Sequence, residues 1–144
     1  MRIRRMIVKN FRSIIDCDFD FGNLVVLLGE NNCGKSNVLA AIELFLKKTK
    51  ANGEFDFNNK NNPIEIEVTF GDLTDFEKNK LKNHIENDEL IIKKIFRYKT
   101  KDDGSPDSDS KTTSITSGGE KNVTPQNIFA GETLPEIYSI PAVR

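Results

Sequence analysis

A short glycine-containing stretch, set between an apolar run and an amphipathic segment, constrains this sequence most strongly. It runs from Gly29 to Ser36 and has the pattern G-x-x-x-x-G-K-S/T, in which backbone N–H groups surround a phosphate. The apolar run 24–28 precedes it and predicts a buried strand. Residues 36–48 follow with apolar side chains at helical spacing and predict a helix. An ordinary strand-to-helix turn that contains Gly-Lys-Ser is the alternative interpretation.

The residue types in this stretch suit a phosphate site for physical reasons. Successive N–H groups in such a loop form a concave anion site, and the N-terminus of the following helix adds the positive end of its dipole. Gly29 and Gly34 allow backbone angles that a Cβ would hinder. We expect Lys35 to reach the β- and γ-phosphates of a nucleotide and the Ser36 hydroxyl to coordinate Mg²⁺.

Composition limits the remaining function classes. The chain has 144 residues, a net charge of −1, 30% charged residues and 37% apolar ones, which predicts one modest domain without a field that draws it to nucleic acid or membrane. We find no apolar run long enough for a membrane span or a signal peptide, so we expect no membrane contact and a cytoplasmic protein.

Two cysteines, Cys17 and Cys33, are too few for a disulfide framework. Cys33 falls within the predicted electropositive loop, where a thiolate would be favoured. The alternative is that a small residue simply fits at that position.

The segments before the loop predict two strands. Residues 2–11 form the first, and Arg12 at its end is a candidate for contacting bound phosphate, because this strand is expected beside the loop; a solvated arginine is the alternative. Residues 15–21 alternate between apolar and acidic side chains and predict a half-buried strand. The side chains expected to face the core from it are Ile15, Cys17, Phe19 and Phe21.

The segments after the helix predict a loop over 47–62, a half-buried strand over 64–70 and a second helix that runs to about Asn87. Thr74 and Glu77 fit a capping box at the start of that helix, Phe76 is expected in the core, and His84 is expected at the surface. Residues 90–99 predict another strand. Its basic side chains either touch a nucleic-acid backbone or protect a solvated edge; they are Lys93, Lys94, Arg97, Lys99 and the adjoining Lys101.

The last third of the chain is low in apolar residues. Residues 100–127 predict a polar, flexible loop with at most a short strand near Ile115. Its Ser117-Gly118-Gly119 looks like the core of the ABC-ATPase signature motif, but no strand ending in acidic residues follows, so we interpret it as a linker. The expected organisation is a lobe over 1–99, this loop, and the start of a further segment over 128–144.

Three stretches together resemble one family. Residues 8–14 are similar to the first strand of RecF-like and SMC-like ATPase heads, and residues 29–42 to their Walker A loop and helix. Residues 134–144 resemble a segment of the OLD (overcoming lysogenisation defect) family of ATP-dependent endonucleases. We therefore expect an α/β fold: the amino-terminal lobe of a P-loop NTPase of ABC/SMC-head type, with a mixed sheet and a P-loop helix.

The resemblance also implies cofactors, partners and site residues. The cofactors are ATP and Mg²⁺, with Ser36 as the metal ligand, and Arg12 is a further candidate contact. Full-length members dimerise around ATP and carry a carboxy-terminal Toprim nuclease domain that cuts DNA in phage defence or DNA processing. The residues implied as nucleotide contacts are Gly29, Asn31, Asn32, Cys33, Gly34, Lys35, Ser36 and Asn37.

Several groups of such an enzyme are not recognisable in this sequence: a Walker B strand, a convincing signature motif and the acidic Toprim residues. Because positioning and charge stabilisation supply most of phosphoryl-transfer catalysis, we expect little or no ATP hydrolysis by this chain alone. It is expected to be a fragment that lacks its carboxy-terminal lobe, or half of a split head that a second chain completes. Alternatives are a RecF-like or SMC-like repair head, an interaction module without nucleotide binding, and a small-molecule kinase.

Overall fold

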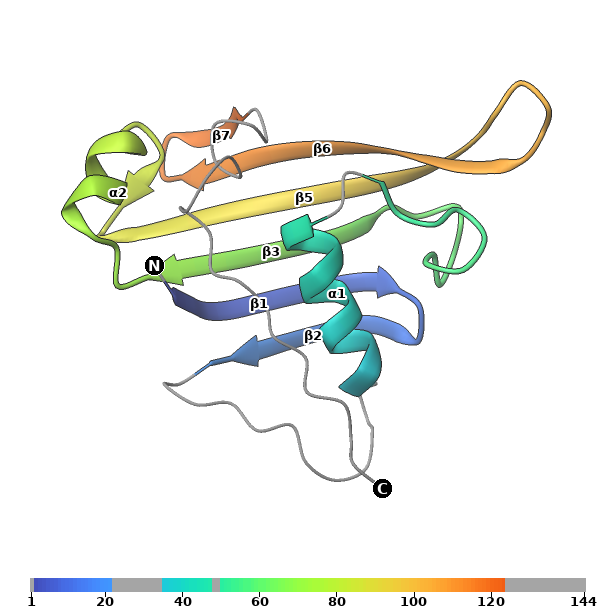
Figure 1. Cartoon of the computed structure of the whole chain (residues 1–144), viewed down its shortest axis with the longest axis horizontal. Coiled ribbons are helices and arrows are strands. Elements are labelled where there is room, and N and C mark those ends of the chain that lie inside the picture. The colour runs from blue at the N-terminus through green and yellow to red at the C-terminus, as the bar shows by residue number, and fades with distance from the viewer. Residues whose placement is uncertain (1, 22–34, 48–49, 124–144) are drawn as a thin grey trace.

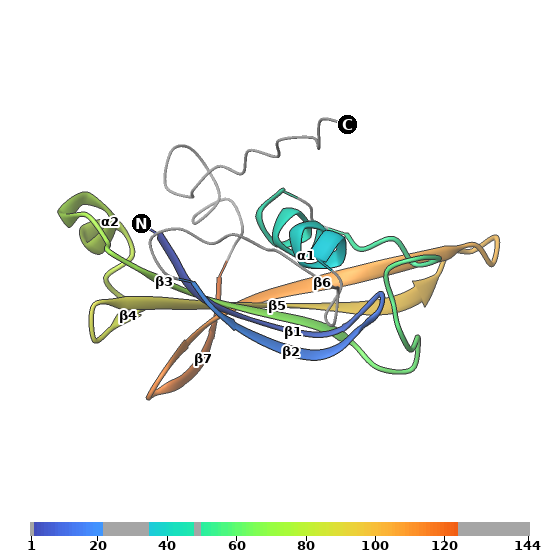
Figure 2. The same ribbon diagram turned by 90° about the horizontal axis from the view of Figure 1, so that it is seen from below.

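The computed structural model describes residues 2–21, 35–47 and 50–123 as one curved sheet with a helix lying across it (Figure 1). Figure 2 shows helices α1 and α2 on the same side of the sheet. None of the helices in these ranges is long and apolar enough to cross a membrane. The elements are β1 (Arg2–Phe11), β2 (Ile14–Asp20), α1 (Lys35–Lys47), β3 (Ile64–Gly71), α2 (Asp75–Lys80), β4 (Ile85–Glu86), β5 (Glu89–Thr100), β6 (Pro106–Thr116) and β7 (Gly119–Asn122).

The sheet has the strand order β2-β1-β3-β5-β6-β7, and β4 pairs with β5 at one end. Every pairing among the described strands is antiparallel. We had expected a mixed sheet around a strand over 24–28, but those residues lie outside the described ranges.

The core lies between α1 and the inner face of the sheet. The central strands β3 and β5 alternate as the sequence predicts, with Ile66, Val68 and Ile92 at most 1% exposed. Phe45 of α1 is fully buried, and its ring lies 6.2 Å from that of Phe70 on β3. Burying one such aromatic side chain stabilises the fold by roughly 1.5–3 kcal/mol, so this interface is what holds α1 against the sheet.

The hairpin between β1 and β2 departs from simple alternation. Asn10 and Arg12 have φ angles of 60° and 52°, which turn the chain between the strands. As a result Phe11 and Ile14 are buried as an opposed pair, and Ile15, which we expected in the core, is 76% exposed. The period-two pattern failed here because it assumes that every residue keeps an extended backbone.

The second helix is much shorter than predicted. The capping box at Thr74 and Glu77 is present, but α2 spans only Asp75–Lys80, and Phe76 is 71% exposed instead of buried. The chain then enters the β4–β5 hairpin through Asn87 and Asp88, whose φ angles of 53° and 60° suit a two-residue turn. The pairing of β4 with β5 therefore replaces the second half of the predicted helix, which had few apolar residues to stabilise it.

The polar segment 100–127 also differs from expectation, because it contains the long strand β6 and the short strand β7. Strand β6 pairs with β5 across the expected boundary at residue 99, so the sheet continues through it. Its inward side chains are small and polar, and Ser108 and Ser114 are fully buried. Serine and threonine gave no hydrophobic signal. The buried Ser108 hydroxyl donates a hydrogen bond to the Ala51 carbonyl at 2.7 Å, whereas the buried Thr113 hydroxyl has no partner among the described residues.

Candidate functional site

Helix α1 begins at Lys35, one residue before the start predicted from the glycine-containing stretch. Residues 29–34 lie outside the described ranges, and only the backbone of Lys35 and Ser36 is described. The first turn of α1 carries no acidic side chain. Its free N–H groups and dipole are therefore not offset by a neighbouring carboxylate of the same turn, which suits an anion such as a phosphate.

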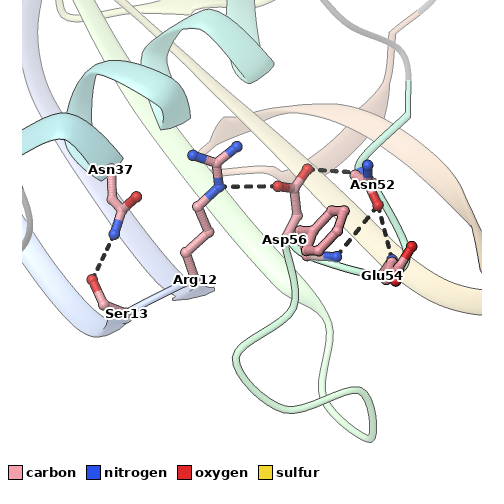
Figure 3. A network of polar contacts seen from close by, with 7 residues as sticks. Arg12, Ser13, Asn37, Asn52, Glu54 and Asp56 are labelled. Carbon is pink, nitrogen blue, oxygen red and sulfur yellow. Dashed lines mark hydrogen bonds and ion pairs between the residues drawn. The ribbon is translucent and has the colours of Figure 1, made fainter.

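The turn between β1 and β2 lies against this end of α1. The Asn37 side chain donates a hydrogen bond from Nδ2 to Ser13 Oγ at 2.7 Å (Figure 3). This contact joins the first turn of the helix to the residue that follows Arg12. Arg12 therefore adjoins the residue that contacts the first turn of the helix. The sequence had placed the first strand beside the loop, which lies outside the described ranges, so that expectation stays a prediction.

The segment that follows α1 holds the same turn in its unusual backbone conformation. Asn10 accepts a hydrogen bond from the Asn59 N–H at 2.8 Å and donates to the carbonyls of Asn59 and Asn62. The Arg12 N–H donates to the Asp56 carbonyl at 2.7 Å. Positive φ angles cost roughly 1–3 kcal/mol when the surroundings do not support them, so these bonds fix the turn in one geometry.

The Arg12 side chain is held by one of its nitrogens. Its Nε donates to Asp56 Oδ1 at 3.0 Å, and Asp56 Oδ2 accepts from the Asn52 N–H at 2.7 Å. The Asp56 side chain is 8% exposed and that of Arg12 is 40% exposed. Among the described residues, no acceptor takes a hydrogen bond from the terminal nitrogens Nη1 and Nη2 of Arg12. Figure 3 shows Arg12 lying between Asn37 and Asp56.

The basic side chains predicted on β5 do not all lie on one accessible surface. Lys94 faces inward and is 3% exposed. Lys93 pairs with Glu65 at 3.3 Å, and Lys99 pairs with Asp109 at 2.6 Å. Neighbouring carboxylates therefore pair with Lys93 and Lys99, and burial lowers the pKa of Lys94, which belongs to the core.

Two other sequence features also have structural explanations. Ser117 to Gly119 form the turn of the β6–β7 hairpin, where Gly119 has a φ of 108°, so no helix begins there as the ABC signature motif would require. His84 is not a free surface residue: its Nδ1 lies 2.6 Å from the buried Ser114 Oγ. Burial and the nearby Lys121 charge lower the pKa of His84.

Sequence reasoning missed Asp56 and Ser13. Asp56 lies 44 residues from Arg12, in a segment whose composition indicated only a loop. An acidic residue in a polar segment, here between Phe55 and Phe57, gives no local signal of a buried ion pair. Only the folding of that segment onto the β1–β2 turn brings the two side chains together.

The antiparallel sheet and the helix that begins within a Gly-Lys-Ser sequence fit the class of proteins with a P-loop NTPase-like fold. More particularly, the model of the AAA ATPase domain family matches residues 1–133, and this chain belongs to that family. Family membership implies a nucleotide as ligand, usually with Mg²⁺. The residues of the first turn of α1 and the nearby Arg12 fit an anionic ligand.

The chain is also similar to two characterised proteins. It is 43% identical over 44 residues to the OLD nuclease of Thermus scotoductus, a match that covers 31% of this chain and 8% of that protein. The fold is similar to a solved structure described as "Structural biochemistry of ATP-driven dimerization and DNA stimulated activation of SMC ATPases". That similarity has a TM-score of 0.51 and 20% identity and covers 90% of this chain and 76% of the other; it supports the fold alone. Together these findings confirm the resemblance to the amino-terminal ATPase part of OLD-like and SMC-like proteins.

Proposed function

We propose that this chain is the ATP- and Mg²⁺-binding lobe of an OLD-like ATP-dependent endonuclease. One observation carries the proposal: helix α1 begins at Lys35, within the Gly-Lys-Ser sequence, and the β1–β2 turn that contains Arg12 is hydrogen-bonded to the first turn of α1 through Asn37 and Ser13. The proposed site would combine the N-terminus of α1 with the Lys35 and Arg12 cations. This combination suits a triphosphate, whose charge is spread over several oxygens.

Each residue of the proposed site has a separate role. Backbone N–H groups of the loop from Gly29 to Gly34 would hold the phosphates, with Asn31, Asn32 and Cys33 supplying the intermediate ones. Lys35 would contact the β- and γ-phosphates, and Ser36 would hold Mg²⁺, which neutralises charge on the phosphate oxygens. Asn37 would fix the helix against the β1–β2 turn, and Arg12 would add a second cation beside the phosphates.

The partners that we propose follow from the similar proteins. The OLD relative is named a nuclease, and the SMC structure is described by ATP-driven dimerisation and activation by DNA. We propose that a carboxy-terminal lobe or a second chain completes the ATPase, that the complete protein is a homodimer in the cytoplasm, and that it acts on DNA in phage defence or DNA processing. On its own, this chain would bind ATP and hydrolyse little of it.

The SMC-like fold favours a second candidate, the head of a RecF-like or SMC-like DNA-repair ATPase or a non-catalytic half of a split one. This second candidate has the same nucleotide site as the first and differs from it by lacking a nuclease domain. A nuclease assay on the complete protein separates the candidates: metal-dependent cutting of DNA supports the OLD-like one, and ATP-dependent DNA binding without cutting supports the other.

The first experiment measures equilibrium binding of MgATP to this chain and to Lys35→Ala. Hydrogen bonds to charged groups contribute about 1.5–3 kcal/mol, so the substitution should weaken binding roughly 10- to 150-fold. Lys111→Ala is the matched control, because Lys111 is an exposed lysine on β6. Binding that is equal in the parent and in Lys35→Ala would refute the proposed site.

A further inference from the structure

A buried carboxylate that no nucleotide would touch lies next to the proposed site. Asp56 is 6% exposed, and both of its carboxylate oxygens are engaged, one by Arg12 Nε and the other by the Asn52 N–H. A buried charge is destabilising unless it is paired and hydrogen-bonded. Arg12 supplies the compensating charge, and its guanidinium also lies over the Phe11 ring, with Cζ 5.0 Å from the ring centroid. The bond to Asp56 therefore fixes the Nε side of the guanidinium.

The segment that carries Asp56 is itself anchored. Ser108 of β6 is fully buried and donates to the Ala51 carbonyl at 2.7 Å. Asn52 Oδ1 accepts from the Glu54 N–H at 2.9 Å, and the Asp56 N–H donates to the Asn52 carbonyl at 2.9 Å. A continuous series of contacts therefore runs from β6 through this segment to Arg12, and the carboxylate is held in place before any ligand arrives.

The geometry of the guanidinium gives this contact a consequence for binding. It carries N–H groups on Nε, Nη1 and Nη2 in one plane. Asp56 uses Nε alone, which leaves the four terminal N–H groups for another acceptor. A bidentate contact with a phosphate needs two of those groups in a fixed orientation.

We propose that Asp56 is a positioning residue, which holds Arg12 by Nε and so directs its terminal nitrogens toward the phosphates bound at the start of α1. This inference rests on the proposed function, because it requires that Arg12 contacts the nucleotide. Asp56 itself makes no contact with the nucleotide.

The test is a double-mutant cycle on MgATP affinity, with the parent, Arg12→Ala, Asp56→Asn and the double variant. Hydrogen bonds to charged groups predict a loss of about 10-fold for Arg12→Ala and a similar or smaller loss for Asp56→Asn. If Asp56 acts only through Arg12, the double variant binds within about 2-fold of Arg12→Ala. If Asp56 merely stabilises the fold, its loss weakens binding equally with and without Arg12.

The chain offers a matched control for removing an Arg–Asp pair. Arg5 and Asp18 form an ion pair between β1 and β2, away from α1. Asp18→Asn should leave MgATP affinity unchanged. Thermal unfolding of every variant shows whether a loss of affinity accompanies a loss of the folded state.

A second measurement needs no substitution at Asp56. In the ¹⁵N-labelled parent, the Arg12 Nε–H resonance, assigned by its absence in Arg12→Ala, should exchange slowly with water because Nε donates to a buried carboxylate. It should persist when MgATP is added, because only the terminal nitrogens take the phosphate. Loss of its protection on adding MgATP would show that Arg12 leaves Asp56 to bind, which overturns the inference.

The outcomes separate the two proposals. If Lys35→Ala loses MgATP affinity but Asp56→Asn does not, the positioning role is wrong and the nucleotide site stands. The same conclusion follows if Asp56→Asn weakens binding equally when Arg12 has been replaced by alanine. Absence of MgATP binding by the parent overturns both.

Discussion

Lys94 is a buried lysine whose charge should make the stability of this protein depend on pH in an unusual direction. It lies on the inner face of β5, opposite Ile66 on β3 and Thr112 on β6. Its Nζ donates to the Phe45 carbonyl at 2.8 Å. Phe45 lies in the last turn of α1, so this hydrogen bond joins Lys94 to the carboxy-terminal end of the helix.

Burial lowers the pKa of Lys94 from 10.5 to about 8. A shift of this size corresponds to about 3 kcal/mol, the free energy that folding loses below pH 8 by keeping the ammonium out of water. The unfolded chain binds the proton more tightly, so the contribution of Lys94 to stability rises as the pH increases from 8 toward 10.5. Most of the penalty is therefore absent at pH 10.

Lys94→Met separates the two effects, since methionine keeps a long unbranched side chain without charge. At pH 7 the variant no longer has the cost of burying a charged ammonium. It also loses the hydrogen bond to the Phe45 carbonyl, which costs about 1–3 kcal/mol. The two changes nearly cancel, so the free energy of unfolding of the variant should be close to that of the parent. At pH 10 the lysine of the parent is largely neutral, so the variant differs from it mainly by the missing hydrogen bond. The stability of the parent relative to the variant should thus rise by about 2–3 kcal/mol between pH 7 and pH 10.

Urea unfolding at both pH values and equal ionic strength, followed by far-ultraviolet circular dichroism, measures this difference. Lys93→Met removes the same charge from the opposite face of β5 and controls for net charge. The reasoning would be refuted if the difference between parent and Lys94→Met changed by less than about 0.5 kcal/mol, the usual error of such comparisons.

Two further predictions concern His84 and the packing of the segment after α1. His84 is the single histidine of the chain, and its ring resonances should titrate with a midpoint below 6.5, because burial and Lys121 favour the neutral form. The unfolded chain then takes up the proton first, so stability should fall as the pH drops below 6.5; a midpoint at or above that value contradicts this. Gly53→Ala would place a Cβ 2.7 Å from Asp107 N and should cost about 1–3 kcal/mol in urea unfolding. Gly118→Ala, where the nearest atom is 3.6 Å away, should cost much less, and equal losses would be the contrary result.

The candidate site was predictable from sequence where its features are local. The glycine-containing stretch predicted the start of α1 to within one residue, because the same residues that hold a phosphate also begin the helix. Arg12 was a candidate because the strand before it was expected beside the loop. Its phosphate contact stays a prediction. Its contact with Asp56 had no sequence signal, since it depends on how the segment after α1 folds back.

The sequence by itself determined the strands β1, β3 and β5, the helix α1 and the capping box of α2. In each of these, neighbouring residues impose the structure through side-chain alternation, helical spacing or a side-chain bond to a nearby N–H.

Only the tertiary structure decided the polar strand β6, the short length of α2, the exposure of Ile15 and the inward position of Lys94. Their conformations depend on other parts of the fold. Strand β6 pairs with β5, the β4–β5 hairpin ends the helical segment, and Lys94 donates a hydrogen bond to the Phe45 carbonyl near the end of α1. A backbone hydrogen bond to a neighbouring strand is available to any residue except proline, so composition did not reveal it.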